Sequence, residues 1–186
     1  MEHPTADALQ AGLDQIRRSP ADGGRVDLIV RRPAENAREV LVEGTLDRAE
    51  GLVGDTWRTR PGGMTRDGSP HPDLQLTVMD SRVAALLAGQ ADRWQLAGDQ
   101  LYVDLDLSQA NLPPGTRLAL GSAVIEISQP PHRGCKKFAE RFGQDALRFV
   151  NSPEGRKLRL RGVNAKVVVA GTICVGDAVR KRPASA

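Results

Sequence analysis

The chain has 186 residues, a length that suits one compact domain. Hydrophobic residues make up 40% of it but aromatic residues only 3%, so aliphatic side chains must supply most of a core, which favours sheets. The net charge of +3 is spread along the chain and does not demand nucleic acid, which we do not expect as a partner. Local clusters of cations would instead suit a small anionic cofactor.

The cysteine count and the apolar runs indicate the compartment. Cys135 and Cys174 are too few for a disulfide framework, and the first residues lack the pattern of a signal peptide. No apolar run approaches the roughly 20 residues that span a bilayer, so no membrane insertion is expected. These features predict a cytoplasmic protein.

The first 24 residues predict a helical appendage. Leu9, Leu13 and Ile16 share one helical face within residues 5–18, and Pro20 and Gly23 end the pattern. We expect a β-rich domain to follow at residues 25–181 and a flexible tail at residues 182–186, beginning to fray at Lys181.

From residue 25 onward the sequence is typical of short strands. We predict them at residues 26–32, 38–46, 74–79, 101–107, 117–120, 123–128, 158–161, 165–170 and 172–179, the first two forming a hairpin and the last containing a turn at Gly176-Asp177. Helices are expected at residues 81–88 and 136–150, and a long irregular loop at residues 51–72. Because strands and helices do not alternate regularly, we predict a mostly β fold, a twisted antiparallel barrel with a few short peripheral helices.

Cys135 is the strongest candidate for chemistry. Pro130 and Pro131 cannot donate ladder hydrogen bonds and should end a strand, which places Cys135 at a strand-to-helix junction. The cations Arg133 and Lys136 and a helix N-terminus favour the thiolate, which serves both as a nucleophile and as a soft metal ligand. The alternative is a small buried residue, the usual role of a free cysteine and the one we expect for Cys174 in its apolar run.

Two further features are weaker signals. His132 can orient a ligand beside Cys135 or be an ordinary surface histidine, and the three histidines have no zinc-site spacing. Gly54 and Asp55 end a turn whose amides can approach a phosphate and whose carboxylate can accept from a pterin-like amine, although glycine and aspartate also occur in ordinary turns. The common nucleotide cradles, GxGxxG and GxxxxGK[ST], are absent.

Four segments in combination resemble the MOSC family, named for the C-terminal domain of molybdenum cofactor sulfurases. They are residues 51–55 (GLVGD), 98–121 (GDQLYVDLDLSQANLPPGTRLALG), 123–138 (AVIEISQPPHRGCKKF) and 159–177 (RLRGVNAKVVVAGTICVGD), within about residues 40–181. The resemblance to a small stand-alone member implies a barrel of the MOSC type. It also implies a molybdenum-pterin cofactor, held or supplied with sulfur, with Cys135 as metal ligand or sulfur carrier.

The expected contacts to the cofactor follow from the same resemblance and from the local cations. We predict them at Gly54, Asp55, His132, Arg133, Lys136 and Arg161. Two departures concern the pocket: Thr56 and Trp57 stand where relatives often have histidine, and Gly98-Asp99-Gln100 stands in place of a GEN-like triplet. Pyridoxal phosphate, also associated with the family, is not expected, because no lysine lies in a convincing Schiff-base context.

Three functions fit these features, and the sequence leaves open whether the protein is an enzyme. The first is a molybdenum-dependent reductase of N-hydroxylated compounds that takes electrons from a partner protein. The second is a sulfur carrier that forms a persulfide on Cys135 from a desulfurase and delivers it to metal-sulfur centres. The third is a binding module without chemistry.

Overall fold

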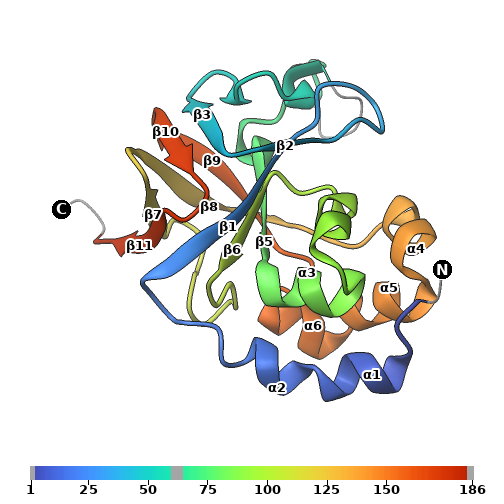
Figure 1. The fold of residues 1–186 in the computed structure, drawn as a ribbon. Coiled ribbons are helices and arrows are strands. Elements are labelled where there is room, and N and C mark those ends of the chain that lie inside the picture. The colour runs from blue at the N-terminus through green and yellow to red at the C-terminus, as the bar shows by residue number, and fades with distance from the viewer. Residues whose placement is uncertain (1–2, 60–64, 184–186) are drawn as a thin grey trace.

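A computed structural model describes residues 3–59 and 65–183 of the chain. Its centre is a mixed barrel of seven strands in the order β11-β7-β8-β9-β5-β6-β1, which closes because β1 also pairs with β11. A second sheet, β10-β3-β4, lies above it, and the helices gather at the other side (Figure 1). The fold is therefore mostly β with a few short helices, as predicted.

The elements have the following bounds. The strands are β1 (Gly24–Arg31), β2 (Glu39–Leu41), β3 (Glu43–Asp47), β4 (Gly51–Leu52), β5 (Leu76–Asp80), β6 (Leu101–Asp104), β7 (Arg117–Leu120), β8 (Ala123–Pro131), β9 (Val163–Val169), β10 (Gly171–Cys174) and β11 (Ala178–Arg182). The helices are α1 (Ala6–Ala11), α2 (Leu13–Ile16), α3 (Ser81–Ala88), α4 (Lys136–Phe142), α5 (Gln144–Asn151) and α6 (Pro153–Leu158), with 3₁₀ helices η1 (Thr56–Thr59), η2 (Pro72–Leu74) and η3 (Ala91–Ala97).

One pair of neighbouring strands departs from the predicted antiparallel arrangement. β5 and β6 run parallel, with Val78 opposite Leu101 and Met79 opposite Tyr102. The chain passes from β5 through α3 and η3 before it enters β6, and a crossover of this kind is what parallel neighbours require. α3 has its predicted bounds, but its part in a crossover was not predicted.

Several predicted elements are divided in the structure. The strand at 38–46 is two strands, because the chain leaves β2, beside β1, and enters β3 in the second sheet. The helix at 136–150 is split into α4 and α5 by Gly143, whose φ of +91° is incompatible with a continuous helix. The turn predicted at Gly176-Asp177 is confirmed and separates β10 from β11.

Other predicted boundaries are wrong. Residues 158–161 are not a strand, because α6 reaches Leu158 and Arg159 then takes a left-handed conformation. β8 continues to Pro131, opposite Val163, because the Pro130 carbonyl can still accept a hydrogen bond from the Asn164 side chain. β6 ends at Asp104. β11 extends to Arg182, and residues 184–186 of the expected tail lie outside the described residues. The predicted loop at 51–72 contains β4 and η1, and its residues 60–64 lie outside the described residues.

Two apolar clusters form the core. The first fills the barrel and is wholly aliphatic, as the composition predicted, whereas the second lies between barrel and helices and holds Tyr102, Phe138 and Phe142. The alternation along β6 separates them, because Leu101 and Val103 join the first cluster and the intervening Tyr102 joins the second. The second cluster therefore anchors α4, the helix that carries Cys135 at its start.

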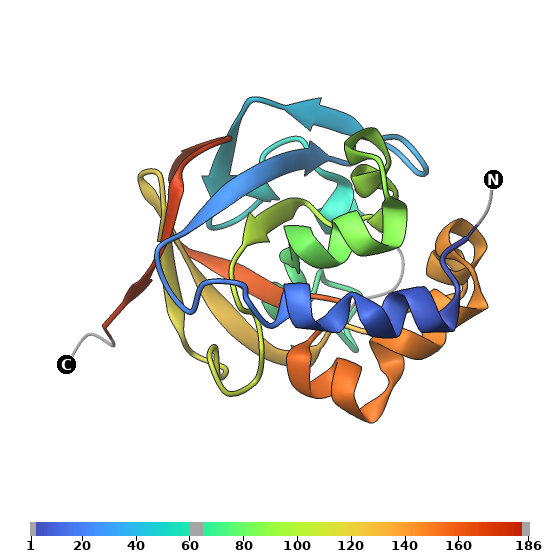
Figure 2. The ribbon, with the colours of Figure 1, turned by 60° about the horizontal axis from the view of Figure 1, so that its bottom comes forward.

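The N-terminal helices belong to the second cluster. The predicted apolar face is confirmed, because Leu9, Leu13 and Ile16 are all buried there. Gly12 divides the predicted helix into α1 and α2, and a Cβ at this position would lie 2.5 Å from Leu86. Figure 2 shows α1 and α2 running along the same side of the barrel as α5 and α6. None of the helices in the described part of the chain has the length and apolarity needed to cross a membrane.

Candidate functional site

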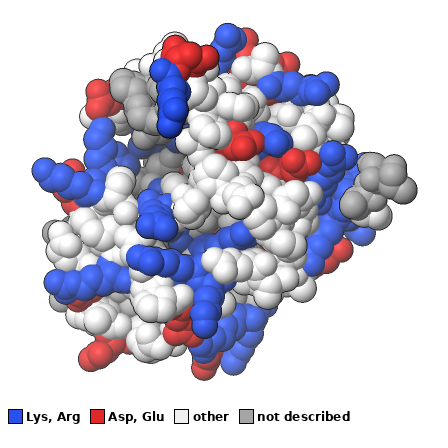
Figure 3. All heavy atoms as spheres, turned by 180° about the vertical axis from the view of Figure 1, so that it is seen from behind, with Lys and Arg blue, Asp and Glu red and all other residues white. Residues whose placement is uncertain are grey.

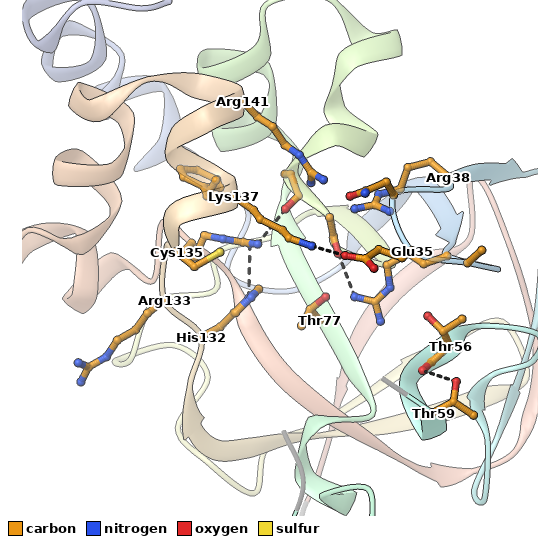
Figure 4. A pocket seen from close by; sticks show the side chains of 17 residues that line it. Glu35, Arg38, Thr56, Thr59, Thr77, His132, Arg133, Cys135, Lys137 and Arg141 are labelled. Atoms are coloured by element: carbon orange, nitrogen blue, oxygen red, sulfur yellow. Dashed lines mark hydrogen bonds and ion pairs between the residues drawn. The ribbon is translucent and has the colours of Figure 1, made fainter. Parts of the chain in front are cut away.

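A cavity of about 550 Å³ opens where α4 begins, beside the β1–β2 connection and the end of η3. Cys135 and His132 lie on one side of it and Thr56 and Thr59 on the other (Figure 4). Among the described residues that line it, one is acidic, Glu35, and six carry a cation: Arg32, Arg38, Arg133, Lys137, Arg141 and Arg161. The cavity, called the Cys135 pocket below, therefore favours an anionic ligand.

Cys135 is exposed and is the N-cap residue of α4. This confirms the predicted strand-to-helix junction, since β8 ends at Pro131 and α4 starts at Lys136. The rings of Phe138 and Phe142 pack in the second core cluster with centroids 5.1 Å apart, which fixes the first turns of the helix. An accessible thiol thus sits on a rigid support at the wall of the pocket.

Arg161 is held in place by a buried carboxylate. Its Nη1 lies 2.7 Å from Asp99 Oδ2, its Nη2 donates to the Ala97 carbonyl at 2.9 Å, and its guanidinium stands 5.0 Å from the centre of the Phe138 ring. Burial raises the pKa of Asp99, while the neighbouring Arg161 acts against that rise. Because both side chains are fixed, the guanidinium is presented to the pocket without further ordering.

His132 shares this buried carboxylate. Its Nδ1 lies 3.4 Å from Asp99 Oδ1 and 3.5 Å from Arg161 Nη1. Asp99 Oδ1 receives no hydrogen bond from any described residue. A protonated Nδ1 would satisfy that carboxylate oxygen by a small movement of the ring. His132 can therefore hold a proton at Nδ1 next to the space that Cys135 lines.

Arg32 is held by a second buried carboxylate, Asp55. Its Nε and Nη2 each donate to Asp55 at 2.8 Å, and its Nη1 donates to the Gly98 carbonyl at 3.0 Å. The Asp55 side chain is 0% exposed and also receives the Trp57 amide at 3.0 Å. Asp55 is thus behind the pocket wall, where it orients Arg32 and does not itself line the cavity.

The remaining cations lie nearer the surface. Arg141 Nη1 donates to the Leu96 carbonyl at 2.7 Å, and Arg38 Nε donates to the Gln95 carbonyl at 3.2 Å, so both are tethered to η3. Lys137 and Glu35 form an exposed pair at 2.8 Å across the opening (Figure 4). Lysine and arginine side chains also surround a hollow on the face shown in Figure 3.

The predicted site residues are only partly brought together. Cys135, His132, Arg133 and Arg161 line the Cys135 pocket, although the Arg133 side chain points away from the others (Figure 4). Three are not among the lining residues: Gly54, Asp55 and Lys136. Gly54 has a φ of +80°, and a Cβ there would lie 2.9 Å from the guanidinium of Arg31. Its role in the structure is therefore to form a turn against that side chain.

Sequence reasoning missed several residues of the pocket. Asp99 and Gln100 were noticed only as departures from a GEN-like triplet, yet Asp99 holds Arg161 and Gln100 accepts from both the amide and the hydroxyl of Thr77. Arg32, at the end of the first predicted strand, gave no local signal. The other lining cations that were missed are Arg38 and Arg141.

Cys174 differs from Cys135 in position and surroundings. The expectation of core packing is wrong, because its side chain is only partly covered and donates to Glu43 at 3.6 Å. Partial burial, with the nearby Glu43 carboxylate, raises the pKa of the Cys174 thiol. Cys174 is therefore a suitable internal control for thiol chemistry at Cys135.

The chain is similar to one known domain family and to several solved structures. A profile of the MOSC domain matches residues 81–180. A search of the curated proteins found no significant match. Among solved structures, the YuaD protein from Bacillus subtilis has a TM-score of 0.64 at 15% sequence identity, over 87% of this chain and 97% of YuaD.

Two YiiM structures are also similar. YiiM from Escherichia coli has a TM-score of 0.55 at 17% identity, over 87% of this chain and 71% of YiiM. YiiM from Geobacillus stearothermophilus has a TM-score of 0.54 at 15% identity, over 86% and 75% of the two chains. At these identities the likeness concerns the fold.

Proposed function

The chain belongs to the MOSC domain family, and on that premise we propose that the Cys135 pocket binds a molybdenum-pterin cofactor with Cys135 as the protein ligand to the metal. One observation carries the proposal: a single exposed thiol lies at the wall of a cavity that five cationic side chains line besides Arg133, whose side chain points away. A soft sulfur ligand suits molybdenum, and the cations suit a phosphorylated organic group.

The metal-ligand chemistry of the chain fits this cofactor better than a free ion. In the described part of the chain, no group of three or more His, Cys, Asp or Glu side chains could hold a metal ion. One thiolate does not retain a metal by itself, so a metal at Cys135 must arrive with ligands of its own. A metal within an organic cofactor meets that condition.

The arginines supply the complementary charge. Arg32 and Arg161 are each fixed by a buried carboxylate, so they are ordered before any ligand arrives. Arg38 and Arg141 are half-buried and tethered to carbonyls of η3, whereas Lys137 is exposed and can adapt to a ligand. Arginine pairs with phosphate in a bidentate manner, which would orient a phosphorylated cofactor as well as hold it.

The same residues suit a reduction at the pocket. When bound, a molybdenum-pterin cofactor supplies two-electron redox chemistry, which would convert an N-hydroxylated compound to the amine or imine with electrons from a partner protein. Removing the oxygen as water also consumes two protons. His132 can hold one of them at Nδ1, because Asp99 Oδ1 lies 3.4 Å away and compensates the charge. Arg161 keeps Asp99 in position.

The first test is metal content. Protein purified from a host that makes the cofactor is expected to contain molybdenum and pterin in near-stoichiometric amounts, and Cys135→Ala is expected to lose most of the molybdenum. Cys174→Ala is the matched control and should retain it, because Cys174 is not among the lining residues. Both variants are first checked for native circular dichroism.

The outcomes separate the parts of the proposal. Equal molybdenum in wild-type and Cys135→Ala protein would exclude Cys135 as the ligand, and its absence from all three proteins would exclude stable cofactor binding. Loaded protein is then assayed with N-hydroxylated purines or amidoximes and a reduced electron donor. Stoichiometric cofactor without turnover would reduce the proposal to a binding module.

The exposure of Cys135 favours a second function, sulfur transfer, because a carrier thiol must be reached by a donor protein. In that reaction the thiolate attacks the terminal sulfur of a donor persulfide. The donor S–S bond breaks, a new S–S bond forms at Cys135 Sγ, and the donor leaves as its thiolate. No change in the metal content of this chain is needed.

Mass spectrometry tests the transfer. After incubation with a cysteine desulfurase and cysteine, we expect one added sulfur atom on the peptide that contains Cys135 and none on the peptide that contains Cys174. The raised pKa of Cys174 makes it the less reactive thiol near neutral pH. Equal labelling of both cysteines would point to non-specific exchange, and no labelling of Cys135 would exclude the carrier role with that donor.

A further inference from the structure

A second cavity, of about 160 Å³, lies beside the Cys135 pocket and shares His132, Arg133 and Arg161 with it. It is bounded by the β8–α4 connection, by α6 and by the start of β9. Pockets for whole small molecules usually measure about 300 to 1,000 Å³, so this cavity suits one chemical group or a very small ligand.

The lining of the second cavity is strongly basic. It contains four arginines, Arg133, Arg156, Arg159 and Arg161, and no aspartate or glutamate among its described residues. Arg161 is paired with Asp99, but the other three form no ion pair with any carboxylate in the described part of the chain. Such a concentration of unpaired guanidinium groups is favourable only if an anion or water compensates it.

Arg133 and Arg159 both line the second cavity. The Arg133 side chain points away from the residues around Cys135 (Figure 4), while the residue also lines the second cavity. Arg159 takes a left-handed conformation, with φ of +51°, and its Nη1 donates to the carbonyls of Leu107 and Leu112. Partial burial lowers the pKa of Arg159, because it removes part of the water around the guanidinium.

A buried hydroxyl supports the same conclusion independently of charge. Ser128 lines the second cavity and is only 7% exposed, yet its Oγ has no hydrogen-bond partner among the residues that the structure describes. An unpaired buried polar group is unfavourable, so a hydroxyl in this position is expected to meet a ligand or a water molecule. A phosphate oxygen would accept its hydrogen bond.

We propose that this second cavity is a binding site for a phosphate group, with Arg133, Arg156 and Arg159 as its cations and the Ser128 hydroxyl as a neutral donor. The site is separate from the thiol chemistry and requires no metal. The phosphate can have two sources. It belongs either to a ligand that extends from the Cys135 pocket past His132 and Arg161, or to a separate small phosphorylated molecule.

The test uses inorganic phosphate and the full chain without cofactor, at constant ionic strength. Amide resonances are followed by NMR during the titration, with Gly155 and Gly162 reporting on the second cavity and Gly98 on the Cys135 pocket. We expect saturable shifts at Gly155 and Gly162. Arg156→Ala, which changes a residue of the second cavity alone, should weaken that binding by about fivefold or more and leave the Gly98 curve unchanged.

Arg180→Ala is the matched control, because it removes an exposed arginine from β11, outside both cavities. It should change the affinity less than twofold, roughly the effect of general charge. Equal losses in Arg156→Ala and Arg180→Ala would overturn the site, as would the absence of saturable shifts at Gly155 and Gly162. Because this titration needs no molybdenum, its result tests the phosphate site whether or not the proposed cofactor binds.

A second titration identifies the source of the phosphate. If cofactor-loaded protein no longer takes up inorganic phosphate at Gly155 and Gly162, the group belongs to a ligand that spans both cavities. If phosphate still binds there, the cavity serves a separate phosphorylated molecule. Both outcomes support the site.

Discussion

Replacing Asp55 with alanine is expected to lower the free energy of unfolding by about 3 to 5 kcal/mol, because it leaves a buried guanidinium without its carboxylate. The Arg32 side chain is 6% exposed and the Asp55 side chain 0%, so water can replace neither partner. Two hydrogen bonds of 2.8 Å from the Arg32 guanidinium and one from the Trp57 amide are lost together. Urea unfolding followed by circular dichroism measures the effect.

A neighbouring ion pair provides the control. Arg31 and Glu39 pair at 2.7 Å between β1 and β2, but their side chains are 31% and 44% exposed. Glu39→Ala should therefore cost less than about 1 kcal/mol, as exposed pairs do. If both substitutions lower the free energy of unfolding equally, burial does not determine the contribution of the Arg32–Asp55 pair to stability.

A further consequence is functional: Asp55→Ala should weaken anion binding in the Cys135 pocket, because Arg32 loses its orientation.

This pair also changes the interpretation of the GLVGD segment. The sequence suggested that Asp55 contacts a ligand directly, whereas the structure places it behind Arg32. A carboxylate in a glycine-rich turn gives the same sequence signal in both cases. Only the position of Arg32, more than twenty residues earlier in the chain, distinguishes a ligand contact from a positioning residue.

Elements set by local signals were predicted accurately. The helix at 81–88 has the expected bounds, because Asp80 accepts the Arg82 amide as an N-cap and Gly89 ends it. The strand at 117–120 is also found as predicted. Elements whose limits depend on distant partners were not predicted. The chain changes sheets between β2 and β3. The alternation of apolar and polar residues does not indicate which sheet a strand joins.

The same distinction applies to the site. His132, Arg133 and Cys135 are close in sequence, so their clustering was visible there, and Arg161 was identified by resemblance. Arg32 and Arg141 come from a strand end and a helix, where an arginine that lines a pocket and one that faces solvent look the same. Asp99 gave no sign of its role because nothing in the sequence reports that it is buried opposite Arg161.

Asp80→Asn is expected to remove a pH dependence from the stability of the protein. Asp80 is buried at the start of α3, where Oδ2 accepts the Ser19 hydroxyl at 2.7 Å and Oδ1 accepts the Arg82 amide at 2.8 Å. Burial raises its pKa from 3.8 to about 7, an effect that the two hydrogen bonds only partly offset. The protonated carboxyl is therefore the form that the fold favours.

The sign of the effect follows from the two states. Below pH 3.8 the carboxyl is protonated in both, whereas between pH 3.8 and about 7 the folded protein retains a proton that the unfolded chain has released. The free energy of unfolding therefore falls as the pH rises through this window, by up to roughly 4 kcal/mol from this group, and the loss is complete above it.

The difference between wild-type and Asp80→Asn protein isolates this contribution from other titrating groups. An asparagine can still accept the Arg82 amide and does not ionise, so the variant should gain on the wild type as the pH rises from 4 to 8. Ser19→Ala removes one hydrogen bond to the ionised form and should extend the wild-type decline to higher pH. Parallel stability curves for wild-type and Asp80→Asn protein would show that Asp80 has an ordinary pKa and that its buried charge is fully compensated by Ser19 and the α3 N-terminus.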